Sequence, residues 1–109
     1  MQPLNQQQCQ ACEGIGKALT SAQIETLMIQ LQSGWELKSN PDALYQRFSF
    51  KNFYHTMGFV NALAYIANQA NHHPDLCLGY NYCEVRWTTH ALKGLSMNDF
   101  ICASKTDAL

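Results

Sequence analysis

The chain has 109 residues, of which 47% are hydrophobic and 14% are charged, proportions typical of one compact domain and not of a disordered chain. Its formal net charge is −1 and its basic residues are few and scattered, which argues against direct binding to nucleic acid. No apolar stretch is long enough to span a bilayer, so we expect no contact with a membrane.

The first 19 residues are expected to form a loosely ordered leader before one domain at residues 20–109. They are rich in glutamine and show no hydrophobic periodicity. Because they also lack the basic and apolar regions of a secretory signal, we expect a cytoplasmic protein. In that reducing compartment the five cysteines, an odd number, are expected to be free thiols.

A helix followed by a hairpin is predicted after this leader. A capping box that starts at Thr20 predicts a helix that ends at Gly34, a residue typical of helix ends. Residues 35–37 then open a short strand, and the Asn-Pro-Asp segment at 40–42 predicts a turn. Residues 44–51 alternate between apolar and polar side chains, so the two runs predict a β-hairpin.

A longer helix is predicted next, with Asn52 as its N-cap. Its apolar stripe is expected to consist of Phe53, Met57, Val60, Leu63, Ala64 and Ala67. Because Pro74 restricts the preceding residue to an extended conformation, this helix must end near Asn71. Residues 76–89 then predict two strands that are separated near Gly79.

The last predicted helix begins at Ser96. Asp99 falls in its first turn, where a carboxylate is favoured by the positive end of the helix dipole. The resulting order is helix, strand, strand, helix, strand, strand, helix. The simplest way to bury these patterns is an α+β fold, a four-stranded antiparallel sheet with three helices packed on one face.

Three histidines are the most informative residues for function. His72 and His73 precede Pro74 directly after the long helix, and His90 follows a predicted strand. Histidine exchanges protons near neutral pH, so such a cluster suits acid–base catalysis. The pair alone is equally compatible with an exposed loop without function. Three histidines are also compatible with a catalytic zinc site.

The spacing of these residues resembles a known motif. The run His72-His73-Pro74 is followed by Tyr80, His90 and Asp99, which resembles the signature of the pterin-4a-carbinolamine dehydratase family. Three neighbouring segments are similar to that family as well: Phe50-Lys51-Asn52-Phe53, Trp87-Thr88-Thr89-His90, and Lys93-Gly94-Leu95 through Asn98-Asp99-Phe100. The resemblance covers residues 20–109, and agreement over so many parts is not expected by chance.

The resemblance implies a four-stranded sheet with three helices, assembled as a homodimer or homotetramer. It implies a lyase that removes water from 4a-hydroxytetrahydropterin and yields quinonoid dihydropterin, with no metal, nucleotide or redox cofactor. The pterin would be the one released by an aromatic amino-acid hydroxylase, in particular phenylalanine hydroxylase. The rival hypothesis is a non-catalytic protein-binding module, a dimerisation or transcriptional cofactor. The presence of all three histidines favours the enzyme.

The resemblance also implies a role for each site residue. His72 and His90 are expected to form the acid–base pair near the leaving hydroxyl, while His73 mainly binds the pterin. Pro74 and Thr89 are expected to help form the substrate-binding site.

Asp99 has two candidate roles, since it can stabilise the helix N-terminus alone or also support His90. Tyr80 and Trp87 are candidate pterin contacts, although bulky aromatic residues in strands are more often part of the core, which is the role we predict. Asn68 departs from the family's motif, which usually has an acidic or charged residue there. An amide carries no charge, so we expect this residue to affect the fine tuning of His72.

Cys9 and Cys12 form a single Cys-x-x-Cys pair. A structural zinc site usually needs four ligands, commonly from two such pairs. His55 or a cysteine of another subunit is a candidate to complete the set, but nothing in the sequence requires it. We therefore predict no metal at these cysteines.

Overall fold

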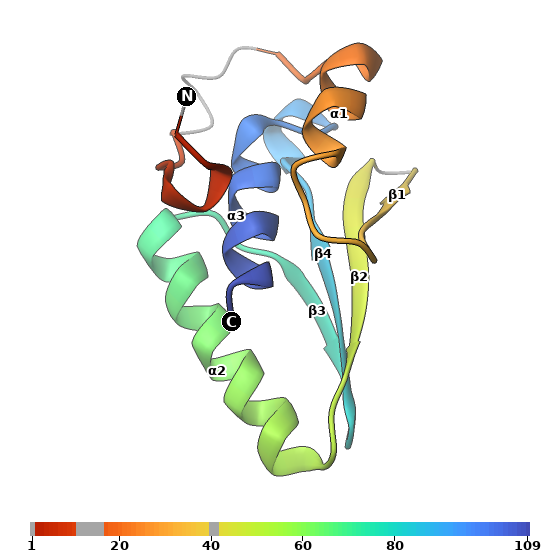
Figure 1. Cartoon of the computed structure of the whole chain (residues 1–109), viewed down its shortest axis with the longest axis vertical. Helices are drawn as coiled ribbons and strands as arrows, with labels where there is room; N and C mark the ends of the chain where they lie inside the picture. The colour runs from red at the N-terminus through yellow and green to blue at the C-terminus, as the bar shows by residue number, and fades with distance from the viewer. Residues whose placement is uncertain (1, 11–16, 40–41) are drawn as a thin grey trace.

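A computed structural model describes residues 2–10, 17–39 and 42–109 of the chain. The helices lie on one face of a four-stranded antiparallel sheet with the strand order β1-β2-β4-β3 (Figure 1). The elements are α1 (Ser21–Met28), β1 (Glu36–Lys38), β2 (Ala43–Ser49), α2 (Phe53–Ala70), β3 (Asp75–Leu78), β4 (Tyr82–Trp87) and α3 (Met97–Asp107), with 3-10 turns at Leu4–Gln6 and His90–Leu92. The predicted α+β fold is confirmed. In the described part of the chain, no helix has the length and apolar character needed to cross a membrane.

Helix α1 begins where the sequence predicts. The Thr20 hydroxyl accepts a hydrogen bond from the Gln23 N–H at 3.2 Å, and the Gln23 side chain accepts one from the Thr20 N–H at 2.8 Å. These two bonds are the capping box that satisfies free N–H groups of the first turn. The predicted end at Gly34 is wrong, because α1 ends at Met28.

Contacts with α3 explain the early end of α1. The carboxylate of Asp107 accepts hydrogen bonds from the Gln32 N–H at 3.1 Å and from Trp35 Nε1 at 2.8 Å. These bonds hold the segment after α1 in an irregular turn, and Gly34 adopts a positive φ of 111° that a side chain would strain. The tertiary contacts thus replace the last turn of helix that the local pattern predicts.

The predicted hairpin is formed by β1 and β2, which pair antiparallel with Leu37 opposite Leu44. The first two residues of its predicted turn, 40 and 41, lie outside the described residues. Strand β2 is central and pairs with β4, which brings Leu44 opposite Trp87 and Phe48 opposite Cys83. Because alternate residues of a strand point to opposite faces, these four side chains share the face that the helices cover.

Helix α2 has the predicted ends. Asn52 caps it by accepting a hydrogen bond from the His55 N–H at 3.0 Å. Asn71 ends it in the left-handed conformation, with φ 51° and ψ 40°, which Asn tolerates better than most residues. This sharp change of direction separates the helix from the histidines that follow.

The predicted apolar stripe of α2 is only partly correct. Leu63 and Ala67 are buried, whereas Phe53 and Ala64 are exposed. Thr56, a polar residue that the stripe omits, is fully buried because its hydroxyl donates hydrogen bonds to the carbonyl oxygens of Asn52 and Tyr80. The helix therefore turns a slightly different face to the sheet than hydrophobicity alone predicts.

The core lies between the sheet and α2 and α3. Its largest fully buried apolar side chains are Trp87, Phe100, Leu44, Leu63 and Val85. The prediction that Trp87 belongs to the core is confirmed, but the same prediction for Tyr80 is wrong, since Tyr80 is 66% exposed. Leu4, in the predicted leader, also joins this core and is 3% exposed.

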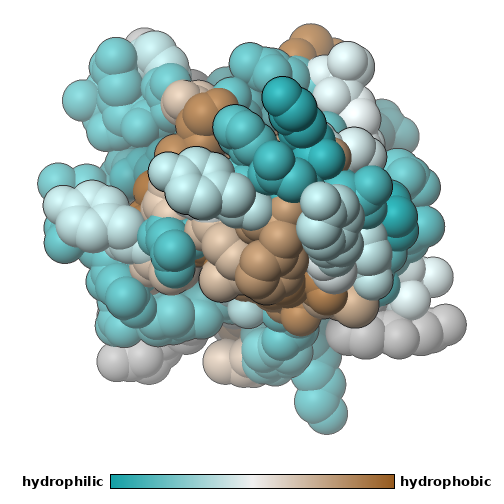
Figure 2. Space-filling model, turned by 90° about the horizontal axis from the view of Figure 1, so that it is seen from below, coloured by the Kyte–Doolittle hydropathy of each residue, from teal (hydrophilic) through white to brown (hydrophobic). Residues whose placement is uncertain are grey.

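Several apolar side chains stay at the surface. Figure 2 shows the lower end of the molecule, where apolar side chains gather in the middle and hydrophilic ones surround them. Helix α2 begins at this end, and its Phe53 and Tyr54 are 47% and 83% exposed. Further along α2, Tyr65 is 67% exposed. The outer face of α2 is therefore the main exposed surface with large aromatic residues.

Replacing Leu63 with Ala tests this core. The side chain is fully buried, so its truncation is expected to lower the free energy of unfolding by about 2–5 kcal/mol. Urea denaturation measures this loss. Ile29→Ala is the control, because Ile29 is 84% exposed and its change is expected to stay within about 0.5 kcal/mol. Equal losses in the two variants would contradict the assigned core.

Candidate active site

The site is built where α2 ends and β4 ends. Asn71 turns the chain out of α2, and the next residue, His72, is 5% exposed. The His72 N–H still donates to the carbonyl oxygen of Ala67 at 3.2 Å, which ties this residue to the last turn of the helix. Pro74 restricts His73 to an extended conformation. The two histidines are thus held by local backbone constraints before any tertiary contact is considered.

A short hydrogen bond joins His72 to Asp99 in the first turn of α3. His72 Nε2 lies 2.6 Å from Asp99 Oδ1, and the carboxylate is fully buried. An ionised carboxylate only accepts hydrogen bonds, so with Asp99 ionised this bond needs the tautomer of His72 that carries its proton on Nε2. His72 Nδ1 has no hydrogen bond with the described residues. The imidazole therefore has one nitrogen that the described residues do not engage.

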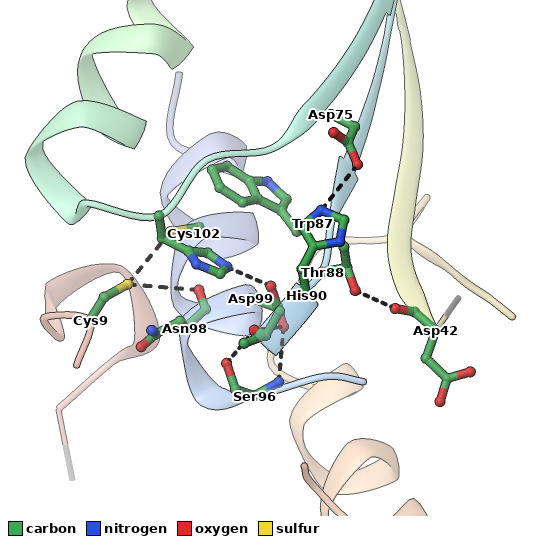
Figure 3. A network of polar contacts seen from close by, with 12 residues as sticks. Cys9, Asp42, Asp75, Trp87, Thr88, His90, Ser96, Asn98, Asp99 and Cys102 are labelled. Atoms are coloured by element: carbon green, nitrogen blue, oxygen red, sulfur yellow. Dashed lines mark hydrogen bonds and ion pairs between the residues drawn. The ribbon is translucent and has the colours of Figure 1, made fainter. Parts of the chain in front are cut away.

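Other groups satisfy the second oxygen of Asp99. Asp99 Oδ2 accepts hydrogen bonds from Thr89 Oγ1 at 2.7 Å and from the Ser96 N–H at 2.9 Å (Figure 3). The Thr89 and Ser96 hydroxyls also contact each other at 2.7 Å. Buried charge is tolerated only when such partners replace water. This network fixes the carboxylate, and the carboxylate in turn fixes the ring of His72.

The indole of Trp87 provides a flat surface for the same imidazole. The two rings are stacked, with centroids 5.6 Å apart and planes 11° from parallel. Trp87 Nε1 donates to the Thr106 hydroxyl at 3.3 Å, which holds the indole in the core. Rotation of His72 is therefore opposed by the indole on one side and by Asp99 at its edge.

The other two histidines of the motif, His73 and His90, are exposed. His90 follows Thr89, and its Nε2 lies 3.7 Å from Asp75 Oδ2 in β3 (Figure 3). His73 Nε2 lies 3.2 Å from Asn68 Oδ1 on α2. Solvent therefore reaches both rings, in contrast to His72.

Two expected contacts have different partners in the structure. Asp99 contacts His72 and not His90, because the start of α3 faces the end of α2. Asn68 contacts His73 and not His72, because Asn71 redirects the chain before the histidines. Any influence of Asn68 on the site thus acts first on an exposed histidine.

All three histidines line one open cavity of about 250 Å³. The other lining residues are Asn71, Thr88, Thr89 and Ala91. A larger cavity of about 560 Å³ is lined by α1, α3 and residues near the N-terminus, and no histidine lines it. Proton transfer needs ionisable groups around the ligand, so we place the candidate site in the smaller cavity.

The sequence alone did not indicate every residue of this cavity. Thr88 was missed, and its hydroxyl donates to the Asp42 carbonyl oxygen at 2.6 Å. Pro74 was predicted to contact substrate but does not line the cavity. Thr89 lines it, yet its hydroxyl is engaged by Asp99 and Ser96. The repeated threonines before His90 were the only sequence signal for such a role.

Comparison with known proteins now defines the family. Residues 17–109 match the family model for "Pterin 4 alpha carbinolamine dehydratase". The chain belongs to this family. Similar relatives include proteins named "Putative pterin-4-alpha-carbinolamine dehydratase" from Legionella pneumophila (strain Corby), at 58% identity, and from Nitrosomonas eutropha, at 50%. Each alignment covers 97% of this chain and 94% or 92% of the relative.

A solved structure has the same fold. It is described as a transcriptional coactivator/pterin dehydratase from Brucella melitensis, and it matches with a TM-score of 0.79 at 29% identity. The match covers 84% of this chain and 97% of the other. The resemblance seen in the sequence is thus confirmed, as is the fold that it implies.

Metal binding is an alternative use of the histidines and cysteines. Within residues 2–10, 17–39 and 42–109, no three His, Cys, Asp or Glu side chains are placed to hold a metal ion. Cys12 lies outside the described residues. Cys9 instead faces Cys102, with the two sulfur atoms 3.6 Å apart.

Replacing Asp99 with Asn tests the buried network. An amide has one accepting oxygen and one donating NH2, so it either leaves the Ser96 N–H without an acceptor or forces His72 into the other tautomer. It also removes the charge that strengthens all three hydrogen bonds. We expect the free energy of unfolding to fall by about 1–3 kcal/mol, as measured by urea denaturation. Asp42→Asn is the control, because Asp42 is exposed and only its backbone oxygen is used. An unchanged Asp99→Asn stability would contradict the network.

Proposed function

We propose that the protein is a 4a-hydroxytetrahydropterin dehydratase, a lyase that yields quinonoid dihydropterin and water. The observation that carries this proposal is the presence of His72, His73 and His90 around one cavity, with the His72 ring fixed by Asp99. Membership of the family supports a pterin as the substrate class. The reaction needs proton transfer at two atoms, which matches a site with several imidazoles.

The mechanism follows from the substrate, which carries a hydroxyl on the carbon next to the ring nitrogen N5. The hydroxyl leaves as water when it gains a proton, and N5 loses its proton as the double bond forms. His72 suits the base, since its Nε2–H is held by Asp99 and its Nδ1 is left to accept the proton. Asp99 then stabilises the imidazolium, as a carboxylate does in other oriented acid–base pairs.

His90 is proposed as the acid that protonates the leaving hydroxyl. It lines the same cavity as His72, and its exposure lets it regain a proton from solvent after each turnover. His73 is proposed to bind the pterin, with Pro74 limiting its backbone freedom. Thr89 is proposed to contribute to the cavity wall and to position Asp99 with its hydroxyl. No metal or organic cofactor enters these steps.

The proposed cellular role is recycling of the pterin used by an aromatic amino-acid hydroxylase such as phenylalanine hydroxylase, in the cytoplasm. We also propose assembly as a homodimer or homotetramer. Two features support assembly: β1 and β3 are the edge strands of the described sheet, and α2 exposes Tyr54 and Tyr65.

A second candidate is a non-catalytic protein-binding module that acts as a dimerisation or transcriptional cofactor. The Brucella melitensis protein of the same fold supports this candidate, because it is described as a transcriptional coactivator as well as a pterin dehydratase. A pure binding module would not need His72 to be oriented by a buried carboxylate. The arrangement of His72 therefore favours the enzyme.

Histidine variants test the proposed enzyme. The wild-type protein is expected to dehydrate freshly generated 4a-hydroxytetrahydropterin faster than the spontaneous reaction. His72→Ala and His90→Ala are each expected to lower kcat by about 10²–10⁴-fold, because each removes an acid or a base. His73→Ala is expected to raise KM more than it lowers kcat. Stopped-flow absorbance at a series of substrate concentrations separates the two constants.

His55→Ala is the matched control, because His55 is exposed on α2 and does not line the cavity. Its kinetics are expected to equal those of the wild type. A wild-type rate no higher than the spontaneous rate would contradict the proposed function. Full activity in both the His72 and His90 variants would contradict the mechanism.

A further inference from the structure

Two cysteines meet next to the buried network although 93 positions separate them in the sequence. Cys9 Sγ lies 3.6 Å from Cys102 Sγ, and it also lies 3.8 Å from the Asn98 carbonyl oxygen (Figure 3). Cys102 is one turn after Asp99 on α3. Cys102 thus lies on α3, the helix whose Asp99 holds His72 in place, and Cys9 contacts this helix.

Specific hydrogen bonds hold Cys9 at this position. The Gln10 N–H donates to Asn98 Oδ1 at 2.9 Å, and Asn98 Nδ2 donates to the Gln10 carbonyl oxygen at 2.7 Å. Asn98 is almost fully buried, so these bonds are protected from water. Leu4, in the same segment, is inserted into the core. The segment is therefore fixed by Leu4 in the core and by Gln10 on α3.

The two thiols differ in reactivity. A hydrogen bond from the Cys102 thiol lowers the pKa of Cys9, as do Lys105 and, when it is protonated, His72. Burial and the charge of Asp99 act in the opposite direction. The pKa of Cys102, in contrast, is raised by its hydrogen bond to Cys9 and by its burial. Cys9 is half-buried and Cys102 is fully buried. Cys9 is therefore the more accessible thiol and the one that ionises more readily, and Cys102 is the thiol positioned behind it.

We propose that Cys9 and Cys102 form a redox-active pair, which a hydroperoxide converts into a disulfide that fastens residues 2–10 to α3. The Cys9 thiolate attacks the peroxide: an S–O bond forms, the O–O bond breaks and hydroxide leaves. Cys9 is thereby oxidised to a sulfenic acid. Cys102 then attacks the Cys9 sulfur, so that the S–S bond forms, the S–O bond breaks and the oxygen leaves with the Cys102 proton as water. In total, two thiols and one hydrogen peroxide give one disulfide and two waters.

The geometry requires only a small movement. A disulfide bond is about 2.05 Å long, so the sulfur atoms must approach by about 1.5 Å. The bond would close a loop that contains most of the chain, which removes freedom from the unfolded state and stabilises the fold. The proposal does not depend on the dehydratase reaction, and its test uses stability and thiol chemistry.

Treatment of the whole protein with equimolar hydrogen peroxide tests the proposal. Non-reducing peptide mapping by mass spectrometry is expected to find the Cys9–Cys102 disulfide. The oxidised protein is expected to have a Tm at least about 5 °C higher, and dithiothreitol is expected to reverse this shift. Cys9→Ser and Cys102→Ala should abolish the shift. Cys77→Ser is the matched control, because Cys77 is exposed on β3 and is not part of the Cys9–Cys102 contact, and it should behave like the wild type.

Alkylation by iodoacetamide, followed at Cys9 by mass spectrometry, gives an independent result. The pH at which the alkylation rate of Cys9 is half-maximal is expected below the ordinary cysteine pKa of about 8.5. Cys102→Ala is expected to raise this pH, because it removes the hydrogen-bond donor to Cys9. If Cys102→Ala does not fold, Cys9→Ser still decides the thermal test. Cys9 is less buried than Cys102, so its substitution disturbs the fold less. A disulfide between Cys9 and Cys12, a disulfide between two chains, or an unchanged Tm would each overturn the proposal.

Discussion

The buried contact between His72 and Asp99 is the interaction on which the site depends. Removing a carboxylate from water costs several kcal/mol, and Asp99 has no exposed surface. Hydrogen bonds from His72, Thr89 and Ser96 offset this cost, and each donor comes from a different part of the chain. The same contact therefore joins the end of α2, the end of β4 and the start of α3. Loss of the carboxylate would affect both the packing and the orientation of the imidazole.

Packed elements lie beside this contact, while His72 also lines the open cavity. Trp87, at the end of β4, stacks on His72 and is held in the core by Thr106. Behind the network, the segment that contains Cys9 lies against α3. The buried imidazole and the exposed ones have different proposed roles. His72 keeps a constant orientation, His90 regains its proton from solvent, and His73 binds the pterin. Such precise positioning favours sites built on helices and strands over sites built on loops.

Local signals in the sequence predicted most of the fold, because they act within a few residues. Asn52 caps α2 as expected, and the helix ends where Pro74 requires. The errors arose where distant residues decide. Asp107 binds the segment that follows α1, and the hydrogen bond of Thr56 to the distant Tyr80 places a polar residue on the buried face of α2. The partner of Asp99 was also missed, since neither its helix position nor the motif spacing specifies which histidine its carboxylate reaches.

A double-mutant cycle on kcat/KM tests the central claim most directly. The four proteins are the wild type, His72→Ala, Asp99→Asn and the double variant, assayed with freshly generated 4a-hydroxytetrahydropterin after each fold is verified. If Asp99 acts through His72, Asp99→Asn should lower kcat/KM at least about tenfold when His72 is present and have little effect when His72 is already Ala. An equal fold-loss in both backgrounds would show that the two residues act independently, and would contradict the account.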